Sequence, residues 1–112
     1  MERYDLKVFQ GETFRQELLF RDSEGETRDL TGYTAYSQVR PDPESDVLIC
    51  SMECTVDGQA GSVTMKIGAD VTSGIEPGCY MYDFAMIDPE DNVRYYIGGK
   101  FSVIPAVTEI EL

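Results

Sequence analysis

The sequence contains no histidine, no tryptophan and only three cysteines. Histidine is the usual general base for a serine or cysteine nucleophile, so the most common form of nucleophilic catalysis has no base here. Paired carboxylates could in principle cleave glycosides, but the carboxylates of this chain fall almost entirely in expected turns rather than around a cleft. The sequence therefore predicts a protein that is not an enzyme and that needs no cofactor.

Basic side chains are also scarce, nine against 21 acidic ones, which gives a formal net charge of -12. Residues 41–92 carry eleven of the acidic side chains and a single basic one, Lys66. Such a field repels phosphate backbones, so we expect no nucleic-acid partner. Two interpretations of the acidic segment stay open: solvated loops that keep the protein soluble, or a surface that meets a basic protein.

Long apolar runs are missing, and none approaches the ~18 residues of a spanning helix. The first residues, Met1 to Asp5, do not have the pattern of a signal peptide. We therefore expect a protein made in the bacterial cytoplasm, with no membrane partner and no transmembrane segment.

The three cysteines are not expected to form a disulfide. Cys50 and Cys54 lie four residues apart on one expected strand, which separates them by about 13 Å, too far for a bridge. Cys79 could pair with one of them only if their strands were neighbours. We expect three buried, reduced thiols, and the missing histidine argues against a structural zinc site.

Apolar side chains recur with a period of two, as in half-buried β-strands. The pattern and the turn residues predict seven strands, near 4–9, 13–21, 33–40, 47–55, 62–67, 79–87 and 93–104. Residues 69–74 leave room for at most one short helical turn. A chain of 112 residues with 42% apolar side chains fits one domain. The sequence predicts an all-β, Ig-like antiparallel sandwich over residues 1–106, followed by a C-terminal tail, residues 107–112.

Glycines and a tyrosine mark structural positions. Gly32 follows a threonine just before an expected strand, and Gly78 precedes Tyr80 at the start of another. A tyrosine at this place resembles the tyrosine corner of Ig-type sandwiches, although simple core packing of Tyr80 is the alternative. Gly98 and Gly99 inside a strand indicate a β-bulge or a close backbone approach.

The expected strand 79–87 is apolar on both faces, interrupted only by Asp83. Its second face lies beneath a loop or tail, or it forms a protein interface. The tail alternates in polarity, so it either frays or adds a strand to a neighbour's sheet. The candidate interface residues are Tyr36, Met81, Ile87, Tyr96, Ile110 and Leu112.

Three oxygen-bearing side chains crowd one expected hairpin loop: Asp88, Glu90 and Asn92. They are the weak candidates for a calcium site, because a hard cation prefers oxygen ligands. The loop has neither the length nor the spacing of an EF-hand, and the same residue types simply favour turns. We therefore expect no metal site.

Several segments recur together in an order that resembles a known family. They are Gln10–Phe14, Phe20–Gly25, Asp29–Ala35, Gln38–Pro41, Pro77–Phe84 and Asp88–Asp91. The chain resembles, over nearly its whole length, a family of small bacteriophage and prophage structural proteins, which also occur as N-terminal domains of baseplate proteins. The resemblance implies an Ig-like sandwich in a virion, associated with the tail, the baseplate or the head, and no catalytic residues.

The leading hypothesis is a phage or prophage structural or assembly protein that works through protein–protein contacts. Its expected partners are other virion or prophage proteins, with homo-oligomerisation also possible. The alternative hypothesis is a calcium-dependent or carbohydrate-binding β-sandwich module that uses exposed tyrosines. A third is a cytosolic regulator that acts on a basic protein through the acidic segment.

Overall fold

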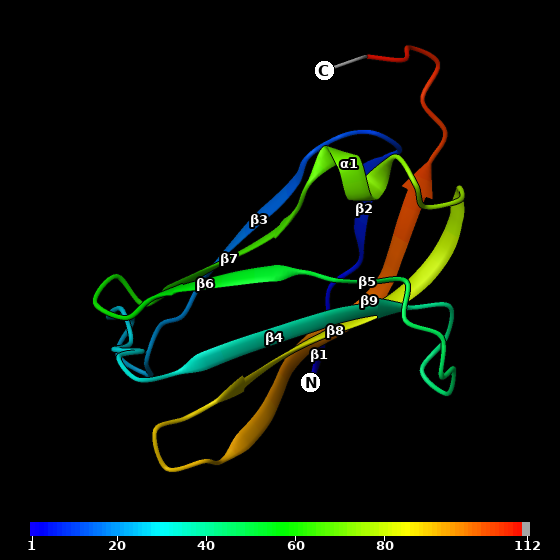
Figure 1. Ribbon diagram of the computed structural model, residues 1–112. Coiled ribbons are helices and arrows are strands. Elements are labelled where there is room, and N and C mark those ends of the chain that lie inside the picture. The colour runs from blue at the N-terminus through cyan, green and yellow to red at the C-terminus, as the bar shows by residue number, and fades with distance from the viewer. Residues whose placement is uncertain (111–112) are drawn as a thin grey trace.

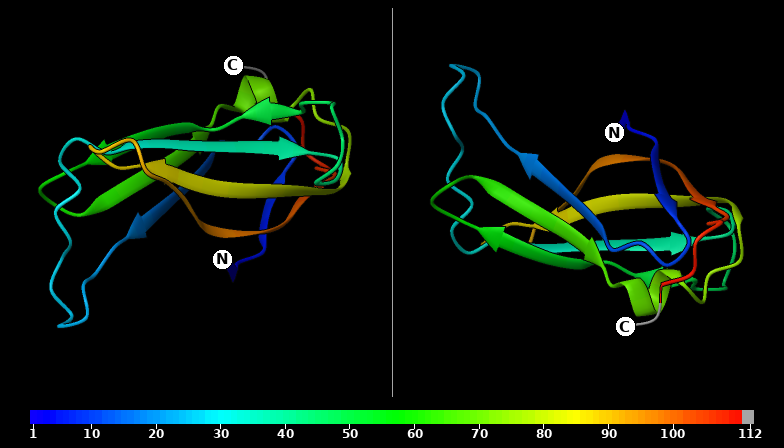
Figure 2. Two further views of the ribbon diagram at one scale, coloured as in Figure 1. Left: turned by 90° about the horizontal axis from the view of Figure 1, so that it is seen from below. Right: turned by 90° about the horizontal axis from the view of Figure 1, so that it is seen from above.

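The computed structural model describes residues 1–110 as two β-sheets packed face to face (Figure 1, Figure 2). The expected class, an all-β Ig-like sandwich, is confirmed. Among residues 1–110 there is no helix with the length and apolar character needed to cross a membrane.

The larger sheet contains β1 (Glu2–Arg3), β2 (Leu6–Phe9), β4 (Thr34–Arg40), β5 (Cys50–Ser51), β8 (Gly78–Ile87) and β9 (Val93–Ile104). Its order is β1-β9-β8-β4-β5, and β2 also pairs with β9. The smaller sheet contains β3 (Phe14–Leu19), β6 (Glu53–Asp57) and β7 (Ser62–Ile67) in the order β3-β7-β6. The short helix α1 (Ala69–Thr72) lies where one helical turn was expected.

More strands are observed among the described residues than the seven expected, because the segment expected at 47–55 is divided in two and because β1 precedes the strand expected at 4–9. The segment expected at 47–55 changes sheet at Met52: β5 pairs with β4 in the larger sheet, and β6 pairs with β7 in the smaller one. Met52 itself is buried. The kink therefore joins the two layers, and it separates Cys50 from Cys54, which were expected on one continuous strand.

The N-terminal strand is interrupted at Asp5, where a side-chain oxygen instead of a backbone carbonyl accepts the hydrogen bond from β9. The Asp5 carboxylate accepts a hydrogen bond from the Lys100 backbone N–H (2.9 Å) and a second one from Arg3 Nε (3.2 Å). On both sides of the break the chain runs parallel to β9, and the Tyr82 hydroxyl donates to the Tyr4 carbonyl. These contacts hold the first nine residues along the edge of the larger sheet.

Acid weakens this attachment. The Lys100 N–H, and after it Arg3, lower the pKa of Asp5 below its ordinary value of 3.8. A lowered folded-state pKa stabilises the fold fully above the unfolded value, and this contribution is lost as the pH falls through the folded value. At neutral pH we expect the Asp5→Ala variant to unfold at a lower urea concentration than the parent protein. In acid the difference between the two midpoints should become smaller, and a difference that is equally large at both pH values would contradict this assignment.

Alternation along the strands places one face of each sheet in the core. The fully buried side chains are Val8, Leu30, Val39, Val63, Met65, Thr72, Phe84, Met86 and Phe101. Aromatic rings link the layers: Phe14 of β3 meets Phe101 of β9 edge to face, with centroids 5.3 Å apart. In β7 and in the second half of β9, most apolar residues are buried at alternate positions, as the period of two predicts.

Tyr80, at the start of β8, makes the hydrogen bond of a tyrosine corner. Its hydroxyl donates to the Glu76 carbonyl four residues upstream, at 2.5 Å. Burial, followed by the nearby Glu76, raises the pKa of this phenol. The bond fixes the turn between α1 and β8, and Gly78 stands beside it, with the Tyr80 ring 3.9 Å from where a Cβ would lie.

Removing that hydroxyl has a modest cost. We expect Tyr80→Phe to lower the free energy of unfolding by about 0.5–1.5 kcal/mol, the net contribution of a typical hydrogen bond. Chemical denaturation followed by circular dichroism measures the difference. Tyr36→Phe is the matched control, because Tyr36 lies exposed on the outer face of β4. Equal changes in both variants would show that the corner bond contributes nothing.

Gly32 has a geometric reason to be glycine. Its φ is +85°, and a Cβ would lie 3.0 Å from Pro89 Cγ in the loop between β8 and β9. The expected hairpin loop at 88–92 is confirmed by the Asp88 N–H, which donates to the Asn92 carbonyl (3.0 Å). A larger residue at position 32 would strain the backbone and push this loop away.

The prediction of three buried thiols is wrong. Cys50 and Cys54 are half-buried, and Cys79 is exposed because it occupies an outward position at the start of β8. All three are free. Burial raises the pKa of Cys50, and it raises the pKa of Cys54 to about 11. These two thiols remain protonated at neutral pH, which makes them poor nucleophiles.

Candidate functional site

The outer face of the larger sheet carries a row of three side chains from neighbouring strands. Tyr36 of β4 lies opposite Ala85 of β8, and Ala85 lies opposite Tyr95 of β9. Tyr36 and Tyr95 are 57% and 54% exposed, whereas Ala85 is 7% exposed. We call these residues the tyrosine row. The strands that carry the two aromatic rings are therefore two strand spacings apart, about 4.8 Å each, and a small side chain lies between the rings.

A β-bulge decides which tyrosine of β9 belongs to this face. The register of β8 against β9 shifts between Phe84 and Ala85, so that Phe84 lies opposite Ile97 and Ala85 opposite Tyr95. The extra residue, Tyr96, turns inward and packs against Phe20 (centroids 5.4 Å apart) and Phe84 (6.4 Å). The expected place of Tyr96 on the exposed face is therefore wrong.

Polar side chains continue the outer face beyond the tyrosine row. In the next row Gln38 lies opposite Asp83, and Asp83 lies opposite Gly98. In the row after it Arg40 lies opposite Met81, and Met81 lies opposite Lys100. Each of the three strands thus contributes one position to each row.

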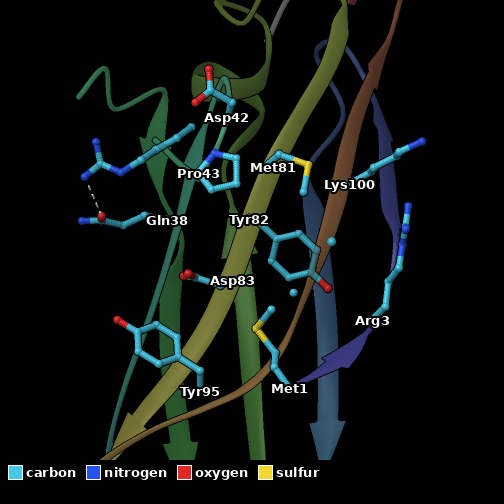
Figure 3. A pocket seen from close by; sticks show the side chains of 13 residues that line it. Met1, Arg3, Gln38, Asp42, Pro43, Met81, Tyr82, Asp83, Tyr95 and Lys100 are labelled. Carbon is cyan, nitrogen blue, oxygen red and sulfur yellow. Dashed lines mark hydrogen bonds between the residues drawn. The ribbon is translucent and has the colours of Figure 1, made fainter. Parts of the chain in front are cut away.

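An open cavity of about 580 Å³ lies on this face, and the N-terminal residues Met1 and Arg3 form part of its lining. The Met1 side chain occupies the space left by the missing side chain of Gly98, with its Sδ and Cε 3.0 Å from where a Cβ would lie. Figure 3 shows Asp83 and Met81 on the central strand, Arg3 and Lys100 toward one wall, and Gln38 and Tyr95 toward the other. The cavity therefore combines apolar, aromatic and charged groups on one surface.

Asp83 lies on the central strand of this cavity and forms no ion pair with another described residue. Partial burial raises the pKa of its carboxyl, and the nearby Arg40 opposes that effect. The Arg40 guanidinium donates instead to Gln38 Oε1 (3.0 Å) and to the Ser45 carbonyl (3.4 Å). Across residues 1–110 the one ion pair within 4.0 Å joins Arg3 to Asp5, so Asp83 has no such partner there. Asp83 is exposed, so water solvates its carboxylate, and a ligand that brings a hydrogen-bond donor or a cation would replace that water.

The cavity also gathers positive charge in an acidic protein. Arg3, Arg40 and Lys100 are three of the nine basic residues, and they line the cavity together with Asp83 and Asp42. The acidic segment 41–92 thus contributes two carboxylates to a site whose other charges are positive. Sequence reasoning missed this cluster, because its members come from four separate parts of the chain.

The remaining interface candidates are divided between the outer face and the tail. Met81 lines the cavity, and half-buried Ile87 lies opposite Thr34 and Val93 at the far end of the same face. Ile110 is 77% exposed in a segment without regular structure. Leu112 lies outside the described residues. The structure therefore brings Tyr36, Met81 and Ile87 together, and it leaves Ile110 apart from them.

The acidic hairpin loop is organised by its own hydrogen bonds. Asp88 Oδ1 accepts from the backbone N–H groups of Glu90 and Asn92, both at 2.9 Å, and Oδ2 accepts from Asn92 Nδ2 (3.1 Å). These bonds lower the pKa of Asp88, the Asn92 N–H contributing most. In the described part of the chain, no group of three or more acidic or cysteine side chains is arranged to hold a metal ion.

Comparisons with known proteins bear on the fold. No protein-family model matches the chain, and no curated protein matches it either. Among solved structures, the crystal structure of CopC from Methylosinus trichosporium OB3b superimposes with a TM-score of 0.50. The alignment covers 95% of this chain and 89% of CopC at 10% sequence identity. At this identity the likeness shows a shared sandwich fold alone.

Proposed function

We propose that this chain is a non-enzymatic structural or assembly protein of a bacteriophage or prophage virion, which binds other virion proteins through the outer face of its larger sheet. The tyrosine row is the observation that carries the proposal. Tyr36 and Tyr95 are each more than half exposed and lie on a sheet rather than on a mobile loop. Rigid tyrosines are enriched at protein interfaces, because they contribute large contact area at a low entropic cost.

The cavity beside the tyrosine row supports the same proposal. Interfaces place their strongest contacts in pockets from which water is excluded. The open cavity lined by Gln38, Met81 and Asp83 would accept a side chain of a partner, and Asp83 would receive a hydrogen bond or a cation from it. The resemblance of the sequence to phage structural proteins supplies the expected class of partner.

Replacing Ala85 with arginine tests the contact surface. The new side chain would project between Tyr36 and Tyr95, while the inward neighbours Phe84 and Met86 would stay in place. We expect Ala85→Arg to weaken partner binding at least tenfold, which corresponds to about 1.4 kcal/mol. Titration calorimetry with the partner measures the change.

The matched control introduces the same side chain on the other sheet. Thr64 lies on the middle strand of the smaller sheet, between the buried residues Val63 and Met65, so Thr64→Arg alters the opposite outer face. The partner is sought among the proteins encoded by flanking genes, each co-expressed with the chain and analysed by native mass spectrometry. Flanking genes without any virion component, or equal binding by both arginine variants, would contradict the proposal.

One observation favours a second candidate, a carbohydrate-binding module. Tyr95 lines the cavity together with Gln38 and Asp83, and an aromatic ring beside planar polar groups suits the apolar face and the hydroxyls of a sugar ring. Calorimetry with soluble oligosaccharides tests it. A heat of binding that the parent protein gives, and that both Tyr95→Ala and Asp83→Asn abolish, would support this second function. If the parent protein gives no heat of binding, the carbohydrate-binding function is ruled out.

A further inference from the structure

A second cavity opens at the side of the sandwich, between the edge of β3 and the first half of β9. Its volume is about 440 Å³. Four half-buried side chains line it and also pack against the core: Leu18, Phe20, Tyr96 and Ile97. More exposed apolar groups continue the lining, with Leu19 49% exposed and Tyr95 54% exposed. We call this cavity the side groove.

Both walls of the side groove are open strand edges. Successive residues of a strand point their backbone groups to opposite sides. The Phe20 N–H donates to the Gly61 carbonyl (2.8 Å) on the side of β7, so the backbone groups of Glu17 and Leu19 face the open edge. There the Glu17 carbonyl accepts only a side-chain hydrogen bond, from Gln16 Nε2 (3.3 Å), among the described residues.

On the opposite wall, β1 pairs with β9 only at Ile97 and Gly98, and β2 pairs from Phe101 onward. Residues 93–96 of β9 therefore lack a neighbour on that side within the described chain. An open edge next to apolar side chains is the usual acceptor for an added strand, because the new strand gains ladder hydrogen bonds and buries alternate side chains.

The charges of the side groove are suited to an acidic strand. Arg21 and Arg94 both line it, against the single carboxylate of Glu2. Arg94 lies over the Tyr96 ring, 5.7 Å from its centroid, and neither arginine forms an ion pair with a carboxylate of residues 1–110. The groove is thus a positive, apolar site on a chain whose net charge is -12.

The chain carries one segment of matching chemistry, the tail that follows β9. Thr108, Ile110 and Leu112 alternate in sequence with Val107, Glu109 and Glu111. Val107 is fully exposed and Ile110 is 77% exposed. In an extended tail, Ile110 would enter the groove on one face, and Glu109 on the other face would give the segment the negative charge that suits a positive site.

The tail is badly placed for the groove of its own molecule. It leaves β9 at Ile104, seven residues along the strand from Ile97, a distance of about 23 Å. Figure 1 shows the tail leaving the end of the sandwich that lies away from the N-terminus. To return, it would have to reverse and pass β2 and β1, which occupy that edge of β9. A second copy of the chain meets no such obstacle.

We propose that the side groove accepts the tail, residues 107–112, of a second copy of this chain as an added strand on β3. The contact is head to tail, so it builds a closed ring or an open chain of subunits according to the rotation between them. The side groove shares Tyr95 with the tyrosine row, but neither Tyr36 nor Ala85 lines it, and the proposal does not depend on the identity of any virion partner.

Two tail variants of the full chain test the proposal by sedimentation velocity over a range of concentrations. Ile110→Asp and Val107→Asp each exchange one exposed apolar side chain for the same charge, on opposite faces of an extended tail. We expect the parent to self-associate, Ile110→Asp to weaken the association at least tenfold, and Val107→Asp to weaken it much less. Leu19→Glu, an exposed change in the groove, should act like Ile110→Asp.

A synthetic peptide of residues 105–112 provides a second measurement. Added to the full-length Ile110→Asp protein, whose groove is intact, it should bind saturably and protect the Glu17 and Leu19 amides from hydrogen exchange. The peptide that carries Ile110→Asp should not bind. A parent that stays monomeric at millimolar concentration and does not bind the peptide overturns the proposal, as does self-association that both tail variants retain in full. Ala85→Arg should leave self-association unchanged, which separates this result from a failure of the proposed function.

Discussion

Replacing Phe84 with alanine is expected to lower the free energy of unfolding by about 3–5 kcal/mol, the usual cost of deleting a buried phenylalanine ring. Phe84 is 0% exposed at the middle of β8. Its ring packs against Phe20, which follows β3 (centroids 6.1 Å apart), and against Tyr96 of β9 (6.4 Å). The ring thus joins the two layers at the bulge, and its removal leaves a cavity that neither sheet can close alone.

Urea unfolding followed by circular dichroism or tyrosine fluorescence measures this loss, since the chain has no tryptophan. Phe9→Ala is the matched control, because Phe9 is 50% exposed at the end of β2. Typical domains have a total stability of 5–15 kcal/mol, so the Phe84 variant should be unfolded or nearly so at moderate denaturant. Similar losses in both variants would mean that Phe84 does not occupy the centre of the core.

Replacing Gly99 with valine is expected to cost about 3 kcal/mol and to release the N-terminal strand from β9. A Cβ at this position would lie 2.5 Å from Asp5 Oδ1 and 3.2 Å from the Tyr4 carbonyl oxygen. Both atoms belong to the segment that joins β1 to β2. The valine therefore breaks the bond between Asp5 and the Lys100 N–H, and it displaces Met1 and Arg3 from the cavity wall.

Hydrogen exchange locates this effect. The amides of Leu6 and Val8 should lose protection in Gly99→Val while those of β7 keep it. Gly78→Val is the control, since Gly78 also lies in a strand of the larger sheet but no atom comes within 3.9 Å of its Cβ position. If Gly78→Val were as damaging as Gly99→Val, the close approach of the N-terminal segment would not be the cause.

Period-two alternation predicted most of the layers, because the direction of a side chain depends on local backbone geometry. Phe14 and Leu18 of β3, Val63 and Met65 of β7, and Phe101 of β9 all pack in or against the core, in agreement with a period of two. The hairpin at 88–92 also followed from its turn residues. The close approach expected at Gly98–Gly99 is confirmed by the contacts of the Gly99 backbone.

The errors occur where alternation is broken by a feature without a strong sequence signal. At the bulge one additional residue of β9 exchanges the directions of Tyr95 and Tyr96. At Met52 a strand passes from one sheet to the other, which leaves Cys50 and Cys54 in different layers. Both features depend on which strands are neighbours, and the period of a pattern carries no information about neighbours.

The cavity was beyond sequence reasoning for the same reason. Asp83 stood out only as the interruption of an apolar strand, yet it lies between Gln38 and Gly98, which are far from it in sequence. Tyr36 and Met81 were identified as exposed because alternation gives the outward face. Their relation to Tyr95, Arg40 and Lys100 follows from strand order, which the chain acquires only on folding.

Hydroxyl-radical footprinting of the tyrosines, in the free protein and in the purified assembly, most directly tests the claim that the outer face of the larger sheet is the contact surface. Tyr36 and Tyr95 should react readily in the free chain and become protected in the assembly. Tyr4, 47% exposed and outside the tyrosine row, serves as the internal reference. Unchanged reactivity of Tyr36 and Tyr95 in the assembly would contradict the account.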